Sequence, residues 1–338
     1  MKKVVTLGEV LMRLSPPGHD RIIGSQSFEA IYGGSEGNVA VALKAFGMQT
    51  SLVTKIPDNA IGDAAIHSFQ AYGVDTSQII RGGERLGTYY LENGYSIRPS
   101  KVVYDRKYSS ITEANIDEFD LDAIFADADL FHVSGITLGI SEKAFQLAQV
   151  FMQESRRRHV PVSFDFNYRS KLWKTEEAKE KFLQVLPHVN IAFAGLLDFT
   201  TFLGIDKKVV ENVDEMNDYQ RIYESVNNQF GFQYIVSSFR DVVSASNNNY
   251  QGLVFNGGNS KISLSKKYNV DIIDRVGAGD SFTAGFLYSY LTNQVDTYKV
   301  EFATAAGALK HTIFGDSLKA TVEEIENLFK SGAYHVQR

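Results

Sequence analysis

The sequence predicts an α/β fold in which a mainly parallel central sheet is covered by helices on both faces. Apolar strand-like runs alternate with helical segments along most of the chain, and those runs are apolar on both faces, as in buried parallel strands. The length of 338 residues is enough for one large domain of this class with an accessory piece. Two modest domains would also fit this length, but we expect a single α/β domain over residues 1–338.

The first quarter of the chain contains two strand–helix pairs. Residues 4–8 are a short apolar run, and residues 35–46 carry apolar side chains at helical spacing, with Gly47 where a C-cap glycine belongs. Residues 50–56, TSLVTKI, form the second strand, and residues 60–72 the second helix. This alternation is typical of parallel strands joined by crossover helices.

Four later apolar runs extend the sheet and are separated by helical segments: residues 130–135, 160–166, 190–195 and 234–238. Ligands of open α/β sheets bind at the carboxyl ends of the strands. Polar residues that directly follow these strands are therefore the candidates for a functional site.

Two stretches interrupt the alternation. Residues 88–94 and 100–110 are strand-like segments separated by a short polar turn, with no helix between them. Inserts at about residues 10–34 and 86–110 are therefore expected to form a small β-sheet that stands off the main layer as a lid. Residues 242–256 are typical of a hairpin that turns at its run of asparagines.

Composition excludes several classes of function. A net charge of −6 and a pI near 5.7 disfavour nucleic-acid binding, which needs clustered Lys and Arg. The absence of cysteine removes disulfides, thiolate metal sites and cysteine nucleophiles, and fits a reducing compartment. Neither a signal peptide nor an apolar membrane span is recognisable, so we expect a cytoplasmic protein without membrane partners.

A glycine-rich turn near the carboxyl end is the main candidate for chemistry. Residues 271–274 are strand-like, and Gly277, Ala278 and Gly279 lead into a helix that begins with Asp280. Such a turn is an anion site, because unpaired backbone N–H groups and the positive end of the helix dipole point into one space. The competing interpretation is structural, with glycines for close packing and Asp280 as a favourable first-turn charge.

Two motifs resemble those of the ribokinase-like (PfkB) carbohydrate kinases. DRVGAGDSFTAGF resembles the carboxyl-terminal signature of that family, and IYGGSEGNVAVALKAFG resembles its amino-terminal glycine motif. The resemblance implies a ribokinase-like fold with a β lid, ATP and Mg²⁺ as cofactors, and Asp280 as the base that deprotonates a sugar hydroxyl. It also implies that the amides of Gly277, Ala278 and Gly279 hold the charge on the transferred phosphoryl group. A monovalent-cation requirement stays open.

The sugar side of the site is expected on the glycine motif and the lid. Gly34 and Asn38 inherit substrate contacts from the resemblance, although a glycine pair before a helix can be a simple turn. Tyr104 and Arg106 share one face of a strand and suit a ligand that ends in a carboxylate, while surface exposure is the simpler interpretation. Tyr90, Tyr104, Arg106 and Arg169 together resemble the substrate set of the 2-keto-3-deoxygluconate kinases of this family.

The nucleotide side rests on weaker signals. Asp165 and Asn167 follow a strand and are expected near the phosphates and metal, with a salt-bridged strand end as the alternative. The resemblance places Ser238, Arg240 and Thr304 along the nucleotide. Asp198 stands where many members carry an Asn-x-x-Glu motif, and Arg275 replaces the usual small residue, so neither receives a firm role.

The sequence thus predicts a sugar-acid kinase that transfers the γ-phosphoryl group of MgATP to the C6 hydroxyl of 2-keto-3-deoxygluconate. A kinase of a neutral sugar, such as fructose or ribose, is the alternative within enzymes. A non-catalytic sugar-acid-binding regulator is the alternative from another class. A homo-oligomer that forms through the lid is expected, whereas gluconate and galactonate stereochemistry are not distinguished.

Overall fold

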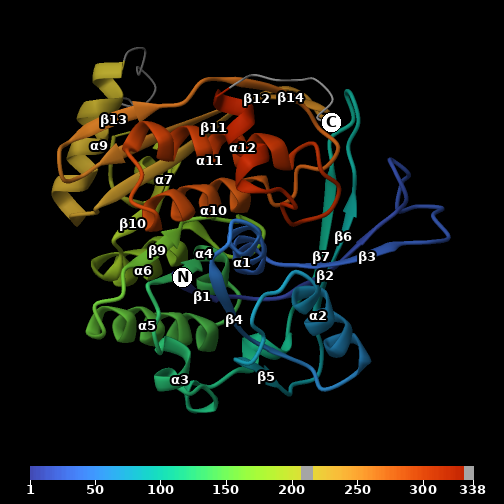
Figure 1. Ribbon diagram of the computed structural model, residues 1–338. Helices are drawn as coiled ribbons and strands as arrows, with labels where there is room; N and C mark the ends of the chain where they lie inside the picture. Colours follow the sequence, from blue (N-terminus) through green and yellow to red (C-terminus); the bar gives the residue numbers. More distant parts are fainter. Residues whose placement is uncertain (207–215, 331–338) are drawn as a thin grey trace.

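The computed structural model describes residues 1–206 and 216–330, and its centre is one large twisted sheet (Figure 1). The main path of this sheet runs β13-β12-β11-β10-β9-β8-β1-β4-β5, and β14 pairs with β12 beside it. Every pair from β11 to β5 is parallel, and β12 pairs antiparallel with each of its neighbours. The strands are β1 (Lys3–Leu7), β4 (Gln49–Ile56), β5 (Ile79–Arg81), β8 (Leu130–Ser134), β9 (Val162–Asp165), β10 (Ile191–Phe193), β11 (Tyr234–Ser244), β12 (Asn247–Asn256), β13 (Lys261–Leu264) and β14 (Tyr268–Asp271).

Helices cover both faces of this sheet, as the sequence predicts. In β10, Ala192 belongs to one buried cluster, while Ile191 and Phe193 belong to another, because successive strand residues point to opposite faces. One face carries α1 (Ser35–Ala45), α2 (Ala60–Ala71), α10 (Ala278–Leu291), α11 (Asp296–Lys310) and α12 (Val322–Lys330). The other carries α3 (Leu121–Phe125), α4 (Gly135–Gly139), α5 (Glu142–Arg157), α6 (Thr175–Val185), α7 (Leu196–Phe202) and α9 (Met216–Phe230). Short 3₁₀ turns occupy Ser110–Glu113, Ile116–Glu118 and Leu186–His188.

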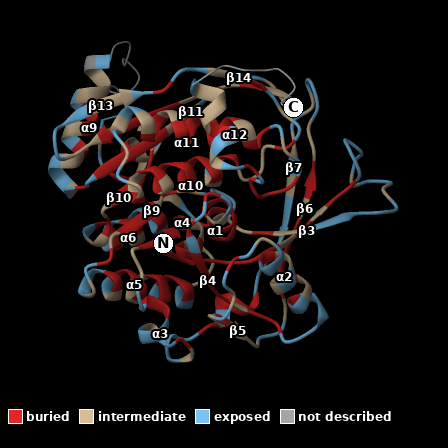
Figure 2. Ribbon diagram, viewed as in Figure 1, coloured by how far each residue is buried: buried red, intermediate tan, exposed pale blue. Residues whose placement is uncertain are grey.

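A second, smaller sheet projects from one side of the α/β body (Figure 1). Its order is β3-β2-β6-β7, with β2 (Leu11–Ser15), β3 (Glu29–Gly33), β6 (Gly87–Glu92) and β7 (Lys101–Asp105). These strands come from the two inserts in which the lid was expected. Figure 2 shows that β3 and β7 carry mostly exposed or intermediate residues, whereas alternate residues of β2 are buried. The lid therefore has one face against the body and free edges in solvent.

Two local predictions were wrong. The β11–β12 hairpin turns at Ala245 and Ser246, before the asparagine run, and the asparagines lie within β12. Asn247 Nδ2 donates to Asp271 Oδ1 at 2.8 Å, so these amides join β12 to β14. The strand before the glycine turn also ends earlier than predicted, since β14 stops at Asp271.

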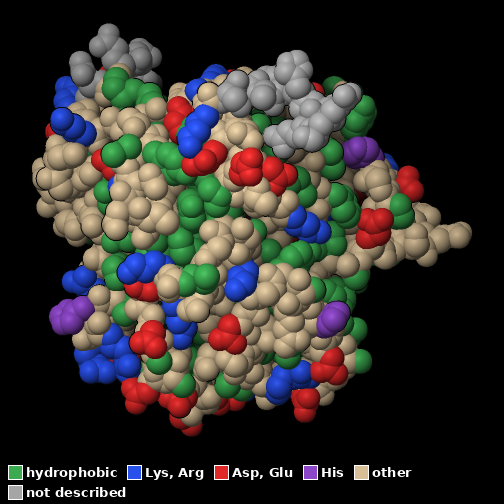
Figure 3. Space-filling view, in the orientation of Figure 1, with side chains coloured by type: hydrophobic (Ala, Val, Ile, Leu, Met, Phe, Trp, Pro, Cys, Tyr) green, Lys and Arg blue, Asp and Glu red, His purple; other side chains and the backbone are tan. Residues whose placement is uncertain are grey.

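The surface carries mixed charge. On the face shown in Figure 3, Lys and Arg side chains are interspersed with Asp and Glu, in line with a net charge of −6. Among the helices of residues 1–206 and 216–330, none has both the length and the apolar character needed to cross a bilayer.

Candidate active site

Asp280 lies in the first turn of α10 and faces the first turn of α1. Its Oδ1 accepts a hydrogen bond from Ser35 Oγ at 3.0 Å, and its Oδ2 accepts one from Asn38 Nδ2 at 2.7 Å. The two sequence motifs thus meet in space, although 245 residues separate Ser35 from Asp280. Both donors fix the rotamer of the carboxylate, which is the arrangement a general base requires.

The same network continues to the carboxyl end of β9. Asn167 Nδ2 donates to Ser35 Oγ at 3.1 Å, and the Asn167 amide donates to Asp165 Oδ1 at 3.1 Å. Asn167 has a φ of 33°, a left-handed conformation that asparagine tolerates better than most residues. Asp165 and Asn167 therefore lie in the same network as Asp280, at the strand end where the sequence places them.

Three carboxylates share this region, and burial shifts each of them. Burial raises the pKa of Asp280 to about 6, against the hydrogen bonds from Asn38 and Ser35 and the charge of Arg169. Burial, followed by the charges of Asp280 and Asp198, raises the pKa of Asp165 to about 8. Burial also raises the pKa of Asp198 to about 6, although the Gly195 amide donates to its Oδ2 at 2.9 Å. Asp280 is thus ionised at neutral pH and basic enough to take a proton.

This crowding of acids fits a divalent cation that is carried by a nucleotide. Within the described part of the chain, no group of three or more His, Cys, Asp or Glu side chains is arranged to hold a metal ion. Mg²⁺ keeps several waters and is commonly bound through one or two carboxylates together with substrate phosphates. A cation near Asp165 would offset both its burial and the charges of Asp280 and Asp198, which together raise its pKa.

The turn before α10 forms an open cradle of main-chain amides. Gly277 is the N-cap, with φ 79° and ψ 0°, and no side chain caps the helix. A Cβ on Gly277 would overlap the main-chain oxygen of Asp316, so both conformation and space require glycine. A Cβ on Gly279 would meet no atom within 4 Å, so an anion has room there. The Ala278 amide makes one long bond, to Arg275 O at 3.4 Å.

Two guanidinium groups, those of Arg240 and Arg275, lie close together near this cradle. Arg275 Nη2 donates to Ala245 O at 2.6 Å, in the β11–β12 turn. Burial and then the charge of Arg240 lower the pKa of Arg275, so the two cations are close. Ser238 and Arg240 occupy alternate positions of β11 and share one face. These groups form a positive rim beside an anion site.

Thr304 does not lie where the nucleotide prediction needs it. It is fully buried in α11, and its Oγ1 donates to Val300 O one turn earlier at 2.6 Å. A Cβ on Gly252 of β12 would overlap the Thr304 hydroxyl, so the side chain packs beneath the sheet. Contact between Thr304 and adenine is incompatible with this packing.

The strand pairing in the lid puts Tyr89, rather than the predicted Tyr90, on the same face as Tyr104. Tyr89 is paired with Tyr104, and Tyr90 with Val103, so Tyr89 and Tyr104 share a face and Tyr90 points to the other. Tyr89 Oη donates to Asp316 Oδ2 at 2.8 Å, next to the α10 turn. Tyr90 instead packs edge-on against Phe28, with 5.9 Å between ring centroids. Tyr89, which the sequence interpretation passed over, faces the site in place of Tyr90.

Arg106 faces the site but already has an anionic partner. Its Nε donates to Glu9 Oε2 at 2.8 Å, its Nη2 bonds to the same oxygen, and Ser109 Oγ bonds to Glu9 Oε1. The guanidinium lies over the Tyr104 ring, 5.6 Å from its centroid. Glu9 therefore orients Arg106 and occupies part of its guanidinium, and the binding of a ligand carboxylate by Arg106 stays a prediction.

Gly34 and Arg169 complete the predicted set. Gly34 is the N-cap of α1, and its amide donates to Asn38 Oδ1 at 3.4 Å. A Cβ on Gly34 would overlap the main-chain oxygen of Glu9, so the close approach requires glycine. Arg169 is exposed after β9, and its charge favours the ionised forms of both Asp165 and Asp280. It is the freer of the two predicted arginines.

A buried ionic network beneath the lid was not predicted. Arg13 of β2 is fully buried, and its Nη1 lies 2.7 Å from Asp274 Oδ2 and 2.6 Å from Asp316 Oδ1. Asp316 also accepts the bond from Tyr89, so the network ties the lid to the segments beside Gly277. The available sequence signal was that Arg13 shares strand parity with Leu11 in LMRLS, a pattern that puts its charge on the same face as an apolar residue.

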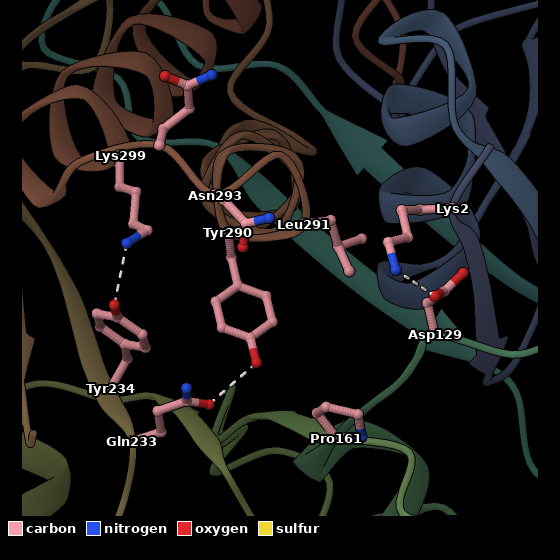
Figure 4. Close-up of a pocket in the computed structure, with 10 residues that line it drawn as sticks. Lys2, Asp129, Pro161, Gln233, Tyr234, Tyr290, Leu291, Asn293 and Lys299 are labelled. Atoms are coloured by element: carbon pink, nitrogen blue, oxygen red, sulfur yellow. Dashed lines mark hydrogen bonds and ion pairs between the residues drawn. The ribbon is translucent and has the colours of Figure 1, made fainter.

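One cavity of the described residues lies away from all of these groups. It measures about 410 Å³, and its lining includes Lys2, Pro161 and Gln233, which precede β1, β9 and β11 (Figure 4). It therefore opens at the amino ends of the parallel strands, opposite the edge that carries Asp280. Its polar side chains bond to one another, as Lys2 does to Asp129 and Tyr290 to Gln233.

Known proteins with a similar sequence or structure cover nearly the whole of this chain. Along the full chain, the 2-dehydro-3-deoxygluconokinase of Thermotoga maritima shares 41% identity and a TM-score of 0.94, with 98% of this chain and 100% of that one covered. The 2-dehydro-3-deoxygalactonokinase of Haloferax volcanii is 29% identical over 336 residues, which are 99% of each chain. A candidate ribokinase II from E. coli, solved in complex with ATP and Mg²⁺, shares the fold, with a TM-score of 0.76 at 17% identity and coverage of 97% and 98%.

The model of the pfkB family carbohydrate kinases matches residues 1–321, which include the α1 motif, the lid and the α10 turn. The chain therefore belongs to the pfkB family and is a carbohydrate kinase close to the kinases of 2-keto-3-deoxy sugar acids.

Proposed function

We propose that this kinase transfers the γ-phosphoryl group of MgATP to the C6 hydroxyl of 2-keto-3-deoxygluconate. The observation that carries the proposal is the hydrogen-bonded chain from Asp280 through Ser35 to Asn167, which brings the candidate base beside Arg169. A carboxylate that accepts a proton and a guanidinium that binds an acid then lie near each other. Relatives at 41% and 29% identity that are named for keto-deoxy sugar acids support this substrate class.

In this proposal, separate groups of residues act as base, orient the base and bind the phosphoryl group. Asp280 takes the proton of the attacking hydroxyl, while Asn38 and Ser35 hold its carboxylate in place. The amides of Gly277, Ala278 and Gly279 stabilise the negative charge that develops on the transferred group. Mg²⁺, when bound with ATP, would neutralise phosphate charge, and Asp165 and Asn167 are the residues that would hold it.

The sugar acid lies between the lid and the end of β9 in this proposal. Tyr89 and Tyr104 cover it from the lid, and Gly34 and Asn38 border it on α1. Arg106, oriented by Glu9, and Arg169 bind its carboxylate from two sides. Ser238, Arg240 and Arg275 line the nucleotide side, and Thr304 is left out because it is buried.

A substrate panel with ATP consumption as the readout tests the proposal. 2-Keto-3-deoxygluconate, 2-keto-3-deoxygalactonate, fructose and ribose are compared by kcat/KM, with an acceptor-free reaction as the blank. We expect the two keto-acids to exceed the neutral sugars, and the gluconate form to lead. Preference for fructose or ribose defeats the sugar-acid assignment. Binding of the acid without ADP formation would favour the regulator instead.

Two further expectations belong to this proposal. A cytoplasmic location is proposed because MgATP is available there. Self-association through the lid is proposed because β7 is an edge strand with exposed apolar side chains, among them Val103 at 52% and Tyr104 at 40% exposure. Sedimentation of the parent chain and of a Val103→Lys variant tests it, since a monomeric parent contradicts the expectation.

A further inference from the structure

Lys310, at the carboxyl end of α11, is a buried charge that the proposed mechanism does not use. Its side chain has no exposed surface, and its ammonium donates to Ile313 O at 2.8 Å and to Asp274 O at 3.4 Å. The nearby carboxylates of Asp274 and Asp316 are bonded to Arg13. Lysine is rarely buried in full, and here main-chain oxygens are the groups that hold it.

The two carbonyl groups belong to the segments that build the anion cradle. Asp274 lies three residues before Gly277, the N-cap of α10. Ile313 lies three residues before Asp316, whose main-chain oxygen packs against Gly277. The Ile273 amide donates to His311 O at 2.8 Å, and the Gly315 amide donates to Asp274 Oδ2 at 3.1 Å. Lys310 is therefore at the junction on which the position of Gly277 depends.

A cation at this junction would offset the repulsion between main-chain carbonyl oxygens. Carbonyl oxygens from two segments that converge on one point repel each other, and a positive charge between them holds the segments together. The ammonium is a compact charge with three donors, which suits main-chain oxygens. Burial lowers the pKa of Lys310 to about 8, against the charges of Asp274 and Asp316, so the ammonium form still prevails at pH 7.

We propose that Lys310 is a built-in cation that positions the α10 cradle, so that this kinase needs no free monovalent cation to bridge the carbonyls of residues 274 and 313. Lys310 is a positioning residue, because it acts through the backbone of the turn rather than on substrate. The catalytic part of this inference rests on the proposed function, whereas the effect on nucleotide binding does not.

Chemical rescue tests the inference. Lys310→Ala removes the charge and leaves space, Lys310→Met removes the charge and fills the space, and Lys299→Ala is the matched control. Lys299 lies on the same helix, is 6% exposed, and is paired with Asp296 at 2.8 Å, away from the cradle. ATP affinity and ATP turnover with the best acceptor are measured in choline, Na⁺, K⁺ and NH₄⁺ salts at constant ionic strength.

We expect the parent to give equal ATP affinity and turnover in all four salts. Lys310→Ala should lose roughly 10- to 100-fold in turnover in choline, with weaker ATP binding, because a small displacement of the cradle misplaces the phosphoryl group. K⁺ or NH₄⁺ should restore a large part of both losses in Lys310→Ala, but not in Lys310→Met or Lys299→Ala. A purely structural role would lower the melting temperature without this selective rescue.

Three results overturn the inference. One is a parent enzyme that depends on K⁺ or NH₄⁺, which is measurable even if both Lys310 variants fail to fold. Another is a folded Lys310→Ala with parental ATP affinity and turnover. The last is equal salt rescue in Lys310→Ala and Lys299→Ala. Failure of every acceptor in the panel defeats the proposed function alone, since ATP affinity by thermal shift still reports on Lys310.

Discussion

The first turn of α10 and the four-stranded lid hold their candidate functional groups in different ways. Around Asp280, contacts are local to helix ends: Ser35 and Asn38 come from one first turn, and Gly277 fixes the other. On the lid, a group is held by an ionic partner instead, as Arg106 is by Glu9. The comparison indicates that the candidate base is held between the first turns of two helices, whereas the arginine of the lid is held by an ion pair.

The largest effect is expected at the base. Asp280→Asn keeps the shape of the side chain but removes the proton acceptor, so turnover should fall by at least roughly 100-fold. Steady-state kinetics with the best acceptor measure this loss. Asp63→Asn, in the exposed first turn of α2, is a matched control that should leave turnover unchanged. A folded Asp280→Asn enzyme with near-parental turnover would remove Asp280 from the mechanism.

The lid side should respond mainly in affinity. Arg106→Ala and Arg169→Ala are each expected to cost about 2 to 5 kcal/mol in binding of the sugar acid, seen as a higher KM. Arg106→Ala also leaves the buried Glu9 carboxylate without its ionic partner. The double variant with Glu9→Gln therefore separates the loss of a ligand contact from the effect of an unpaired buried charge. If the double variant recovers parental KM, Arg106 serves Glu9 rather than the ligand. Unchanged affinity in Arg169→Ala would exclude that arginine.

Two glycine variants test whether the backbone conformation at Gly277 positions the cradle of main-chain amides. Gly277→Ala places a side chain at a φ of 79°, which should cost about 1 to 3 kcal/mol of stability in addition to its clash with Asp316. Gly279→Ala has open space and should keep the parental melting temperature, while its Cβ enters the space proposed for phosphate and raises KM for ATP. Equal melting temperatures for the two variants would contradict the assigned geometry.

The pH dependence of kcat tests the protonation state of Asp280, on the α10 side of the comparison. The base works in its ionised form, and its pKa is raised to about 6, so kcat should fall by about tenfold per pH unit below that value. Asn38→Ala removes a hydrogen bond that favours the ionised form, so the acid limb should move to higher pH. A limb that stays in place in Asn38→Ala would show that another group controls it.

The smallest effect is expected on the far face of the lid. Tyr90→Ala should change KM for the sugar acid by less than about twofold, the range of a substitution away from the site. Tyr89→Phe, which removes the bond to Asp316, should have the larger effect of the two. The reverse order would mean that the lid faces the site through its other side.

The sequence predicted the alternation of strands and helices, because periodicity and cap residues report local structure. It could not set the lid register, in which a shift of one residue exchanges Tyr89 for Tyr90. Nor could it show that Thr304 is buried, since α11 is apolar on most sides and gives no clear solvent face. The partners of Arg13, Arg106 and Lys310 lie in segments that only the fold brings together.

The contact between Ser35 and Asp280 has a consequence for biosynthesis. The acid and its donors lie in distant parts of the polypeptide, so a nascent chain that has reached only Ser35 and Asn38 still lacks Asp280. The three groups come together only when the start of α10 has packed against the start of α1. A local loosening of either helix end would therefore separate the acid from both donors.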